Sequence, residues 1–179
     1  GATAAYTLYG QQGSTTIDAA QGTAQSWAWT FGDGETSTAA QDTTHTYAAP
    51  GIYTTQLQLT NYMDSTGVTV SDEVTILPGV PTVTDPTASP TIGPLSQEIT
   101  LQASVSAEAQ NYFPLTYQWQ EYASGSWIDV SGATTNPATI QIADGAATLH
   151  RFRLAATNAG GTAFSGEVTY QSVAPPVFS

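Results

Sequence analysis

The sequence WAWTFGDG, at Trp27–Gly34, decides the fold of the first half of the chain. Its aromatic residues occupy every second position, which is the period at which side chains on one face of a β-strand repeat. Trp29 and Phe31 are therefore predicted to fill a core position between two sheets. Gly32 and Gly34 allow the positive φ angles of a tight turn, which the aspartate between them can cap. The stretch thus predicts a core strand that ends in a turn.

The same two-residue period recurs along the rest of the chain. Apolar and polar residues alternate in further segments at 53–59, 99–105, 115–119, 140–142 and 152–156. Short strands at a spacing of about 8–12 residues, separated by Gly, Asn and Pro, are typical of β-sandwiches. We therefore predict an all-β chain of two tandem sandwiches. The predicted core comprises Trp29, Phe31 and Tyr53 in the first sandwich, and Trp119, Phe152 and Leu154 in the second.

Prolines mark the boundary between the two halves. Five of the ten prolines lie within residues 77–94. Because proline removes a backbone donor and favours extended backbone, residues 78–94 are predicted to be a semi-rigid linker, or a linker plus the first edge strand of the second module. The domains are then expected at 1–77 and 95–179, each of roughly 80 residues, which is within the usual range for domains.

Three more motifs follow the first strand in a fixed order. They are HTY at His45–Tyr47, PGIY at Pro50–Tyr53 and LQLTN at Leu57–Asn61. In order and spacing, residues 15–77 resemble a PKD (polycystic-kidney-disease) repeat. The resemblance implies an immunoglobulin-like β-sandwich, in which His45 has a structural role and forms a hydrogen bond near the turn.

The second half contains a strand with a central tryptophan and a later strand that ends in a glycine turn. The relevant residues are Tyr117–Gln120, Trp127, Val130 and Arg151–Gly161. They resemble the immunoglobulin-like modules of bacterial surface and phage virion proteins. The resemblance puts Trp119 at the position of the core tryptophan, and Leu101 and Leu154 near the positions of the two half-cystines. Phe152 occupies the tyrosine-corner position and lacks the hydroxyl of that motif.

The chain is strongly acidic. Fourteen acidic residues accompany only two basic ones, Arg151 and Arg153, for a formal net charge of −12. This charge argues against nucleic acid and anionic membrane surfaces as partners, because both are bound through clustered Lys and Arg. No apolar run approaches the roughly 18 residues of a membrane span, so membrane insertion is not expected. Cysteine is absent, so the cores must hold by packing alone.

The sequence contains no recognisable catalytic motif. It has no Gly-x-Ser-x-Gly elbow and no His-Glu-x-x-His, and its acidic residues are scattered among turns. His150 is expected to be exposed at the start of a strand. We therefore predict no enzymatic activity and no cofactor. Calcium is the one alternative, because hard cations bind carboxylate oxygens: the candidate ligands of a weak site are Asp33, Glu35 and Asp42, although solvated turn residues explain these acids better.

Candidate binding residues are aromatic or cationic. Several aromatic rings do not fall clearly on buried faces, and each offers an apolar surface suited to a wet interface. Arg151 and Arg153 lie on the strand face opposite Phe152 and Leu154, where they can pair with local carboxylates or with an acidic partner. The candidates are Tyr62, Tyr112, Phe113, Trp127, Arg151 and Arg153.

Three functions fit these features, by analogy at the level of the fold. The first is a surface-displayed structural or attachment module of a larger assembly, such as a phage head-decoration or tail accessory protein or a prokaryotic cell-surface protein, in contact with other proteins or with surface glycans. The second is a carbohydrate-binding accessory fragment of a secreted hydrolase. The third is a spacer region of a cell-surface adhesin. A start at Gly1 without a signal peptide favours a virion protein, so the expected location is the virion surface or the cell exterior.

Overall fold

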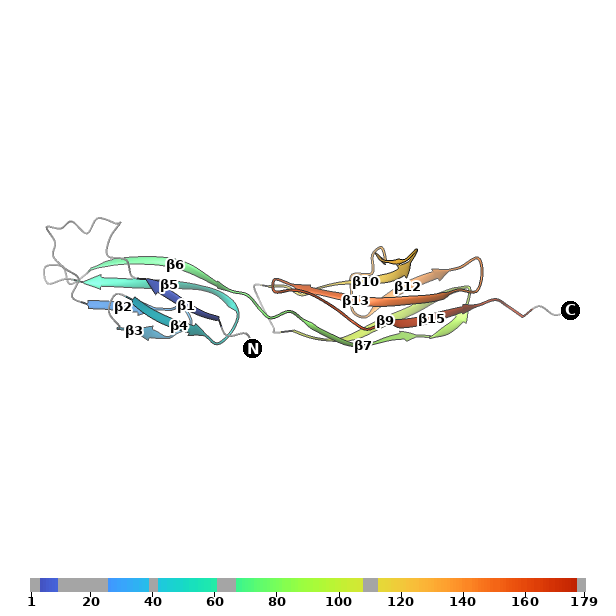
Figure 1. The fold of residues 1–179 in the computed structure, drawn as a ribbon, viewed down its shortest axis with the longest axis horizontal. Helices are drawn as coiled ribbons and strands as arrows, with labels where there is room; N and C mark the ends of the chain where they lie inside the picture. The colour runs from blue at the N-terminus through green and yellow to red at the C-terminus, as the bar shows by residue number, and fades with distance from the viewer. Residues whose placement is uncertain (1–3, 10–25, 39–41, 61–66, 108–112, 177–179) are drawn as a thin grey trace. The chain divides into compact units, whose positions relative to one another are not determined.

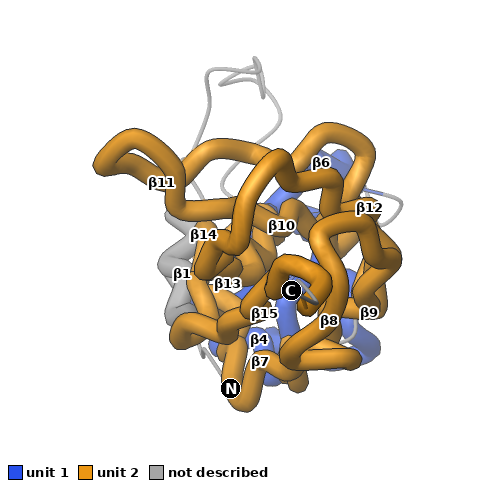
Figure 2. Tube along the Cα trace, turned by 90° about the vertical axis from the view of Figure 1, so that its right-hand side faces the viewer, with its two compact units in different colours: residues 1–78 blue, residues 79–179 orange. Residues whose placement is uncertain are grey.

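The computed structural model describes residues 4–9, 26–38, 42–60, 67–107 and 113–176 of the 179-residue chain, with the backbone alone for 4–9 and 42–43. Every regular element in these ranges is a β-strand, which confirms the predicted all-β class. The chain divides into two compact units, Gly1–Pro78 and Gly79–Ser179, which Figure 2 colours separately. They are called unit 1 and unit 2.

Unit 1 consists of a four-stranded sheet and a two-stranded sheet, both antiparallel (Figure 1). The larger sheet has the order β3 (Thr36–Ser37), β2 (Ser26–Thr30), β5 (Gly51–Thr60) and β6 (Val68–Ile76). The smaller sheet pairs β1 (Ala4–Tyr9) with β4 (Asp42–Tyr47). The buried core side chains are Trp29, Phe31, Tyr47, Leu57, Val74 and Ile76, with Trp27, Tyr53 and Leu59 packed against them.

A column of rings runs through the core of unit 1. Phe31 stacks on His45 with centroids 4.0 Å apart, His45 meets the edge of Tyr47, and Tyr47 stacks on Tyr53 at 4.2 Å. The fully buried Tyr47 donates its hydroxyl to the carbonyl oxygen of Phe31 at 3.0 Å. The half-buried Tyr53 donates its hydroxyl to the carbonyl oxygen of Ala49 at 2.8 Å. The column therefore joins β4 of the small sheet to β5 of the large one.

We expect Tyr47→Phe to lower the free energy of unfolding of unit 1 by about 1–2 kcal/mol, because the buried carbonyl of Phe31 loses its hydroxyl donor while the rings stay packed. Tyr53→Phe is the matched control. It removes a hydroxyl from the same column, but at an exposed hydrogen bond whose carbonyl can turn to water, so its effect should be smaller. Chemical denaturation of both variants measures the difference. Equal effects would contradict the role given to the buried bond.

Unit 2 is a sandwich of a six-stranded and a three-stranded sheet. The larger sheet has the order β11 (Ser126–Asp129), β10 (Thr116–Ala123), β13 (Leu149–Asn158), β15 (Val168–Val173) and β8 (Ile92–Pro94), with β14 (Gly161–Phe164) also paired to β13. The smaller sheet has the order β12 (Ala138–Ala143), β9 (Ser96–Ser106) and β7 (Thr82–Ser89).

The core of unit 2 lies between its two sheets. Trp119, Phe152 and Leu154 of the larger sheet are completely buried, and they pack in one cluster with Ile99 and Leu101 of the smaller one. The indole Nε1 of Trp119 donates to the carbonyl oxygen of Thr135 at 3.1 Å, so its only polar atom is satisfied. Leu101 and Leu154, near the expected half-cystine positions, contribute apolar packing to this core.

Residues 78–94, expected to be a linker or a linker plus an edge strand, contain strands of unit 2. β7 is an edge strand paired with β9, and its register shifts between Thr84 and Thr87. The shift accommodates Pro86, because a bulge in an edge strand leaves a residue without a ladder hydrogen bond. β8 then joins the opposite sheet, in parallel with β15. The proline-rich segment is therefore made of edge strands of the sandwich, which tolerate a residue without a backbone N–H donor.

Candidate functional site

The alternation of β10 and β13 determines which side chains cover the outside of the six-stranded sheet. Trp119 and Leu154 point into the core, so the residues adjacent to them in sequence point outward. The strand register pairs Gln120 with Arg153 and Tyr122 with Trp127. We name the resulting outer patch the aromatic–arginine face. It consists of Tyr122, Trp127, Phe164, Arg151 and Arg153, with their polar partners Gln120, Asp129 and Glu167.

Arg151 holds a carboxylate on this face. Its guanidinium carbon lies 4.5 Å from the ring centroid of Tyr122. Its Nε and Nη2 donate to the two carboxylate oxygens of Glu167 at 2.8 and 2.7 Å. This bidentate arrangement matches the planar guanidinium to the planar carboxylate. Both side chains are more than a third exposed, so water screens the pair and its contribution to stability is small.

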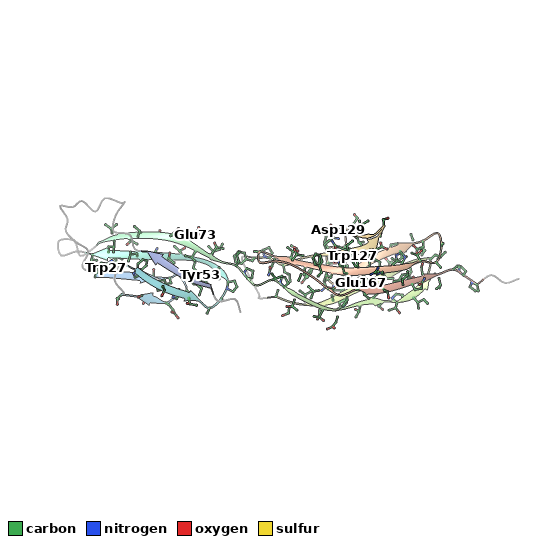
Figure 3. All side chains as sticks on the ribbon, in the orientation of Figure 1. Trp27, Tyr53, Glu73, Trp127, Asp129 and Glu167 are labelled. Atoms are coloured by element: carbon green, nitrogen blue, oxygen red, sulfur yellow. The ribbon has the colours of Figure 1, made fainter. Side chains whose placement is uncertain are left out.

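Arg153 lies against two aromatic rings. Its guanidinium carbon is 4.5 Å from the ring centroid of Trp127 and 4.1 Å from that of Phe164. Its Nε donates to Gln120 Oε1 at 2.8 Å, and Gln120 Nε2 donates to Asp129 Oδ1, also at 2.8 Å. Figure 3 labels Trp127 and Asp129, both on β11. The rings and the amide hold the Arg153 guanidinium in one orientation.

The aromatic–arginine face combines charge with exposed rings. It carries both basic residues of a chain whose formal net charge is −12. Tyr122 is 37% exposed and Phe164 is 48% exposed. Aromatic residues and arginine are the residue types most enriched at protein interfaces, because rigid rings and planar guanidinium groups give large contacts at a small cost in entropy. The arrangement is suited to binding.

The structure unites three of the six predicted binding residues, namely Trp127, Arg151 and Arg153. Phe113 is half-buried and precedes β10, at the opposite end of that strand from Tyr122. Tyr62 and Tyr112 fall outside the described residues. The local pairing predicted for the arginines is present at Arg151 only, since Arg153 has no ion pair with any residue that the structure describes.

Two residues of the face, Tyr122 and Phe164, were missed by the sequence analysis. Tyr122 follows Trp119 by three positions on one strand. Because side chains alternate between the faces of a strand, an odd-numbered spacing from the buried Trp119 puts Tyr122 on the outer face. Phe164 required the register of the β13–β14 hairpin, in which Asn158 pairs with Gly161 and Ala155 with Phe164. That register brings Phe164 next to Arg153.

A second polar group lies inside unit 2, at the start of β13. His150 is 8% exposed, so the expectation that it would be exposed is wrong. Its Nδ1 lies 2.6 Å from Glu121 Oε1 and its Nε2 lies 2.8 Å from Asp144 Oδ2. His150 has the same parity as Phe152 and Leu154, so the alternation of the strand turns it inward.

Both imidazole nitrogens of His150 face carboxylate oxygens, so both must donate, and only the protonated ring has two donors. Burial acts to lower the pKa of His150, but the hydrogen bonds to Asp144 and Glu121 outweigh it and raise the pKa above the ordinary 6.5. Burial acts to raise the pKa of Asp144, but hydrogen bonds with Ser172 and His150 outweigh it and lower the pKa below 3.8. The two carboxylates therefore favour the protonated form of His150.

Two of the three calcium candidates of unit 1, Asp33 and Glu35, lie in the turn after β2. Asp33 Oδ1 accepts the backbone N–H of Glu35 at 3.0 Å, and Asp33 Oδ2 lies 2.7 Å from His45 Nε2. His45 thus forms the hydrogen bond near the turn that the PKD resemblance implies. Gly32 and Gly34 have φ angles of +83° and +96°, the left-handed conformations predicted for this turn.

Burial acts to raise the pKa of Asp33, but hydrogen bonds from the Glu35 backbone and from His45 outweigh it and lower the pKa. The side chain of Asp42 is outside the described set. Within the described ranges, no group of three or more His, Cys, Asp or Glu side chains is arranged to hold a metal ion. Calcium binding at Asp33, Glu35 and Asp42 stays a prediction. The same residues include no helix of the length and apolarity that crossing a bilayer requires.

Comparison with known families supports the identification of unit 1. A family profile described as the PKD domain matches residues 7–76. This confirms the resemblance predicted from the WAWTFGDG, HTY and PGIY motifs. Among curated proteins, none is significantly similar in sequence to this chain.

The matches among solved structures include three at low sequence identity and low TM-score. Murine CEACAM1b is 11% identical with a TM-score of 0.43, over 84% of this chain and 86% of that one. Fibronectin(III)-like modules of Clostridium thermocellum CbhA are 16% identical with a TM-score of 0.34, over 84% and 79%. The D00-D0 domain of intimin is 16% identical with a TM-score of 0.32, over 85% and 79%.

Proposed function

We propose, taking the PKD-domain match of residues 7–76 as the premise, that the chain is a non-catalytic module displayed on a surface, where it attaches to a partner through unit 2. The observation that carries the proposal is the aromatic–arginine face. It gathers both arginines of the chain beside exposed rings on one sheet, and sheet faces of this composition favour protein contacts.

A structural role fits the way each unit is built. The two cores have no residue in common, and in each the histidine is buried and engaged by carboxylates. Side chains fixed in this way support a rigid spacer rather than an acid–base pair free to exchange protons with a substrate. Strand edges and loops then remain available for contacts with neighbouring subunits of an assembly.

The more specific form of the proposal is an accessory protein on the head or tail of a phage virion, with a prokaryotic cell-surface protein as the alternative. Its partners are then other proteins of that capsid, tail or surface layer. The role of a carbohydrate-binding fragment receives less support, because sugars stack on ring faces, and guanidinium groups lie over the rings of Tyr122, Trp127 and Phe164.

Immunogold labelling with an antibody against the chain tests surface display. We expect label on the outside of intact particles or cells from the source, and co-sedimentation of the chain with particles on a density gradient if the surface is a virion. An antigen detected only after lysis, and never in particles, would refute the proposal.

A double variant tests the face itself. Tyr122→Ser with Phe164→Ser should reduce incorporation of the chain into the assembly by about tenfold, since two exposed rings of a contact surface are lost. The control is Thr100→Ser with Gln102→Ser, two exposed positions on β9 in the other sheet of the same unit. Equal incorporation of the two variants would place the contact elsewhere on the molecule.

A further inference from the structure

The two arginines of the aromatic–arginine face are held in similar ways but differ in one respect. Each guanidinium lies over an aromatic ring at 4.5 Å, Arg151 over Tyr122 and Arg153 over Trp127. Arg151 holds both oxygens of Glu167, whereas Arg153 makes a single hydrogen bond, from Nε to Gln120. Neither Nη atom of Arg153 has a hydrogen-bond partner in the part of the chain that the structure describes.

We propose that the guanidinium of Arg153 binds one carboxylate from an aspartate or glutamate of a protein partner. The proposal rests on the attachment function assigned to this face. The two Nη groups form a planar edge whose N–H groups donate to both oxygens of one carboxylate. Contact with Trp127 and Phe164, together with the hydrogen bond to Gln120, fixes this edge before the ligand arrives, so little rotamer entropy is lost on binding.

The net negative charge of the chain favours a ligand with one carboxylate at Arg153 over a ligand with many negative charges. A ligand with many negative charges is repelled by a protein of net charge −12, and Arg153 alone cannot compensate. A single acidic side chain between apolar neighbours avoids this repulsion. Its neighbours can pack on Phe164 and Tyr122, which are 48% and 37% exposed at the two sides of the site. A protein segment satisfies both conditions.

The probe is a capped pentapeptide with one central glutamate between threonine and valine residues, titrated into the full chain and followed by ¹⁵N NMR. We expect shifts of the Arg153 Nε–H signal and of amides in β11, β13 and β14, with a Kd in the millimolar range typical of short isolated contacts. The same peptide with glutamine should bind about tenfold more weakly, because the charge-assisted pair is lost.

Two variants test the site. Arg153→Lys keeps the charge but removes the planar edge, so it should weaken binding of the glutamate peptide about tenfold. Thr100→Ser, at an exposed position on β9 in the other sheet of unit 2, is the control and should leave this binding unchanged. Undiminished binding to the Arg153→Lys variant would overturn the proposal.

The remaining outcomes are equally decisive. Equal affinity for the glutamate and glutamine peptides would refute the carboxylate site. If both peptides still shifted the NMR signals of the face, the attachment function would stand. Absence of shifts with the glutamate peptide would also refute the site. If an oligogalacturonate bound more tightly than the peptide, the proposal of a protein partner would be wrong and the ligand would be an acidic glycan.

Discussion

Trp119→Ala should remove a large part of the stability of unit 2 while unit 1 keeps its own. The indole is completely buried and belongs to the core cluster that joins side chains of both sheets. Removing a buried tryptophan costs about 3–5 kcal/mol through lost burial and the cavity that remains. The whole stability of a domain of this size is about 5–15 kcal/mol. The carbonyl of Thr135 also loses its indole donor, which adds to the cost.

Differential scanning calorimetry measures this effect. We expect the transition of unit 2 to disappear or to shift down by about 12–40 °C, at roughly 4–8 °C per kcal/mol for a domain of this length. The transition of unit 1 should stay in place, because its core around Trp29 shares no residue with that of unit 2. Trp127→Ala is the control, as this tryptophan lies on the outer face. Similar losses for both substitutions would show that Trp119 is not the centre of the core.

The second large effect concerns His150 and pH. Because the folded-state pKa of His150 is raised, its contribution to stability is complete below the ordinary pKa of 6.5 and is lost as the pH rises through the raised value. Because the pKa of Asp144 is lowered, its contribution is present above 3.8 and is lost as the pH falls through the lowered value. Unit 2 should therefore be most stable between the ordinary pKa of Asp144, 3.8, and that of His150, 6.5. It should be less stable in alkaline solution.

His150→Leu should remove the alkaline decline and should destabilise unit 2 most where His150 is protonated, between the carboxylate range and the raised pKa of His150. Breaking a buried ion pair costs about 3–5 kcal/mol, and the lower end applies here because Glu121 is 35% exposed and water reaches its carboxylate. Denaturation from about pH 4 to about pH 9 measures both effects. Leu149→Ser, at the exposed neighbouring position, should keep the wild-type profile. A flat profile in the unaltered protein would contradict the protonated histidine.

Sequence reasoning predicted the parts of the structure that depend on local pattern. The alternation around Trp29 and Phe31 and the glycines after them specify a strand and a turn within eight residues, and the structure has both. The proline-rich segment could not be assigned in the same way. Whether Pro86 lies in a linker or in a bulged edge strand depends on β9, which follows it in the sequence and supplies the pairing.

The candidate site shows the same division between local and long-range information. The outward orientation of Arg151 and Arg153 followed from one strand, but their ring partners come from three further segments whose register no local signal reveals. His150 was within reach of sequence reasoning, since parity with Phe152 turns it inward. It was missed because a histidine beside a turn is usually solvated, and because Glu121, one of the two carboxylates that permit its burial, comes from a distant strand.

The interruption in β7 has a consequence for crowded arrays of this protein. When many copies are fixed side by side, their free sheet edges come close together. An unbroken edge strand could then pair with the edge strand of a neighbouring molecule, and repeated pairing would build a fibre. A strand laid along β7 loses its ladder at the shift between Thr84 and Thr87, where Pro86 has no hydrogen to donate. Copies packed at high density can therefore remain separate molecules along this border.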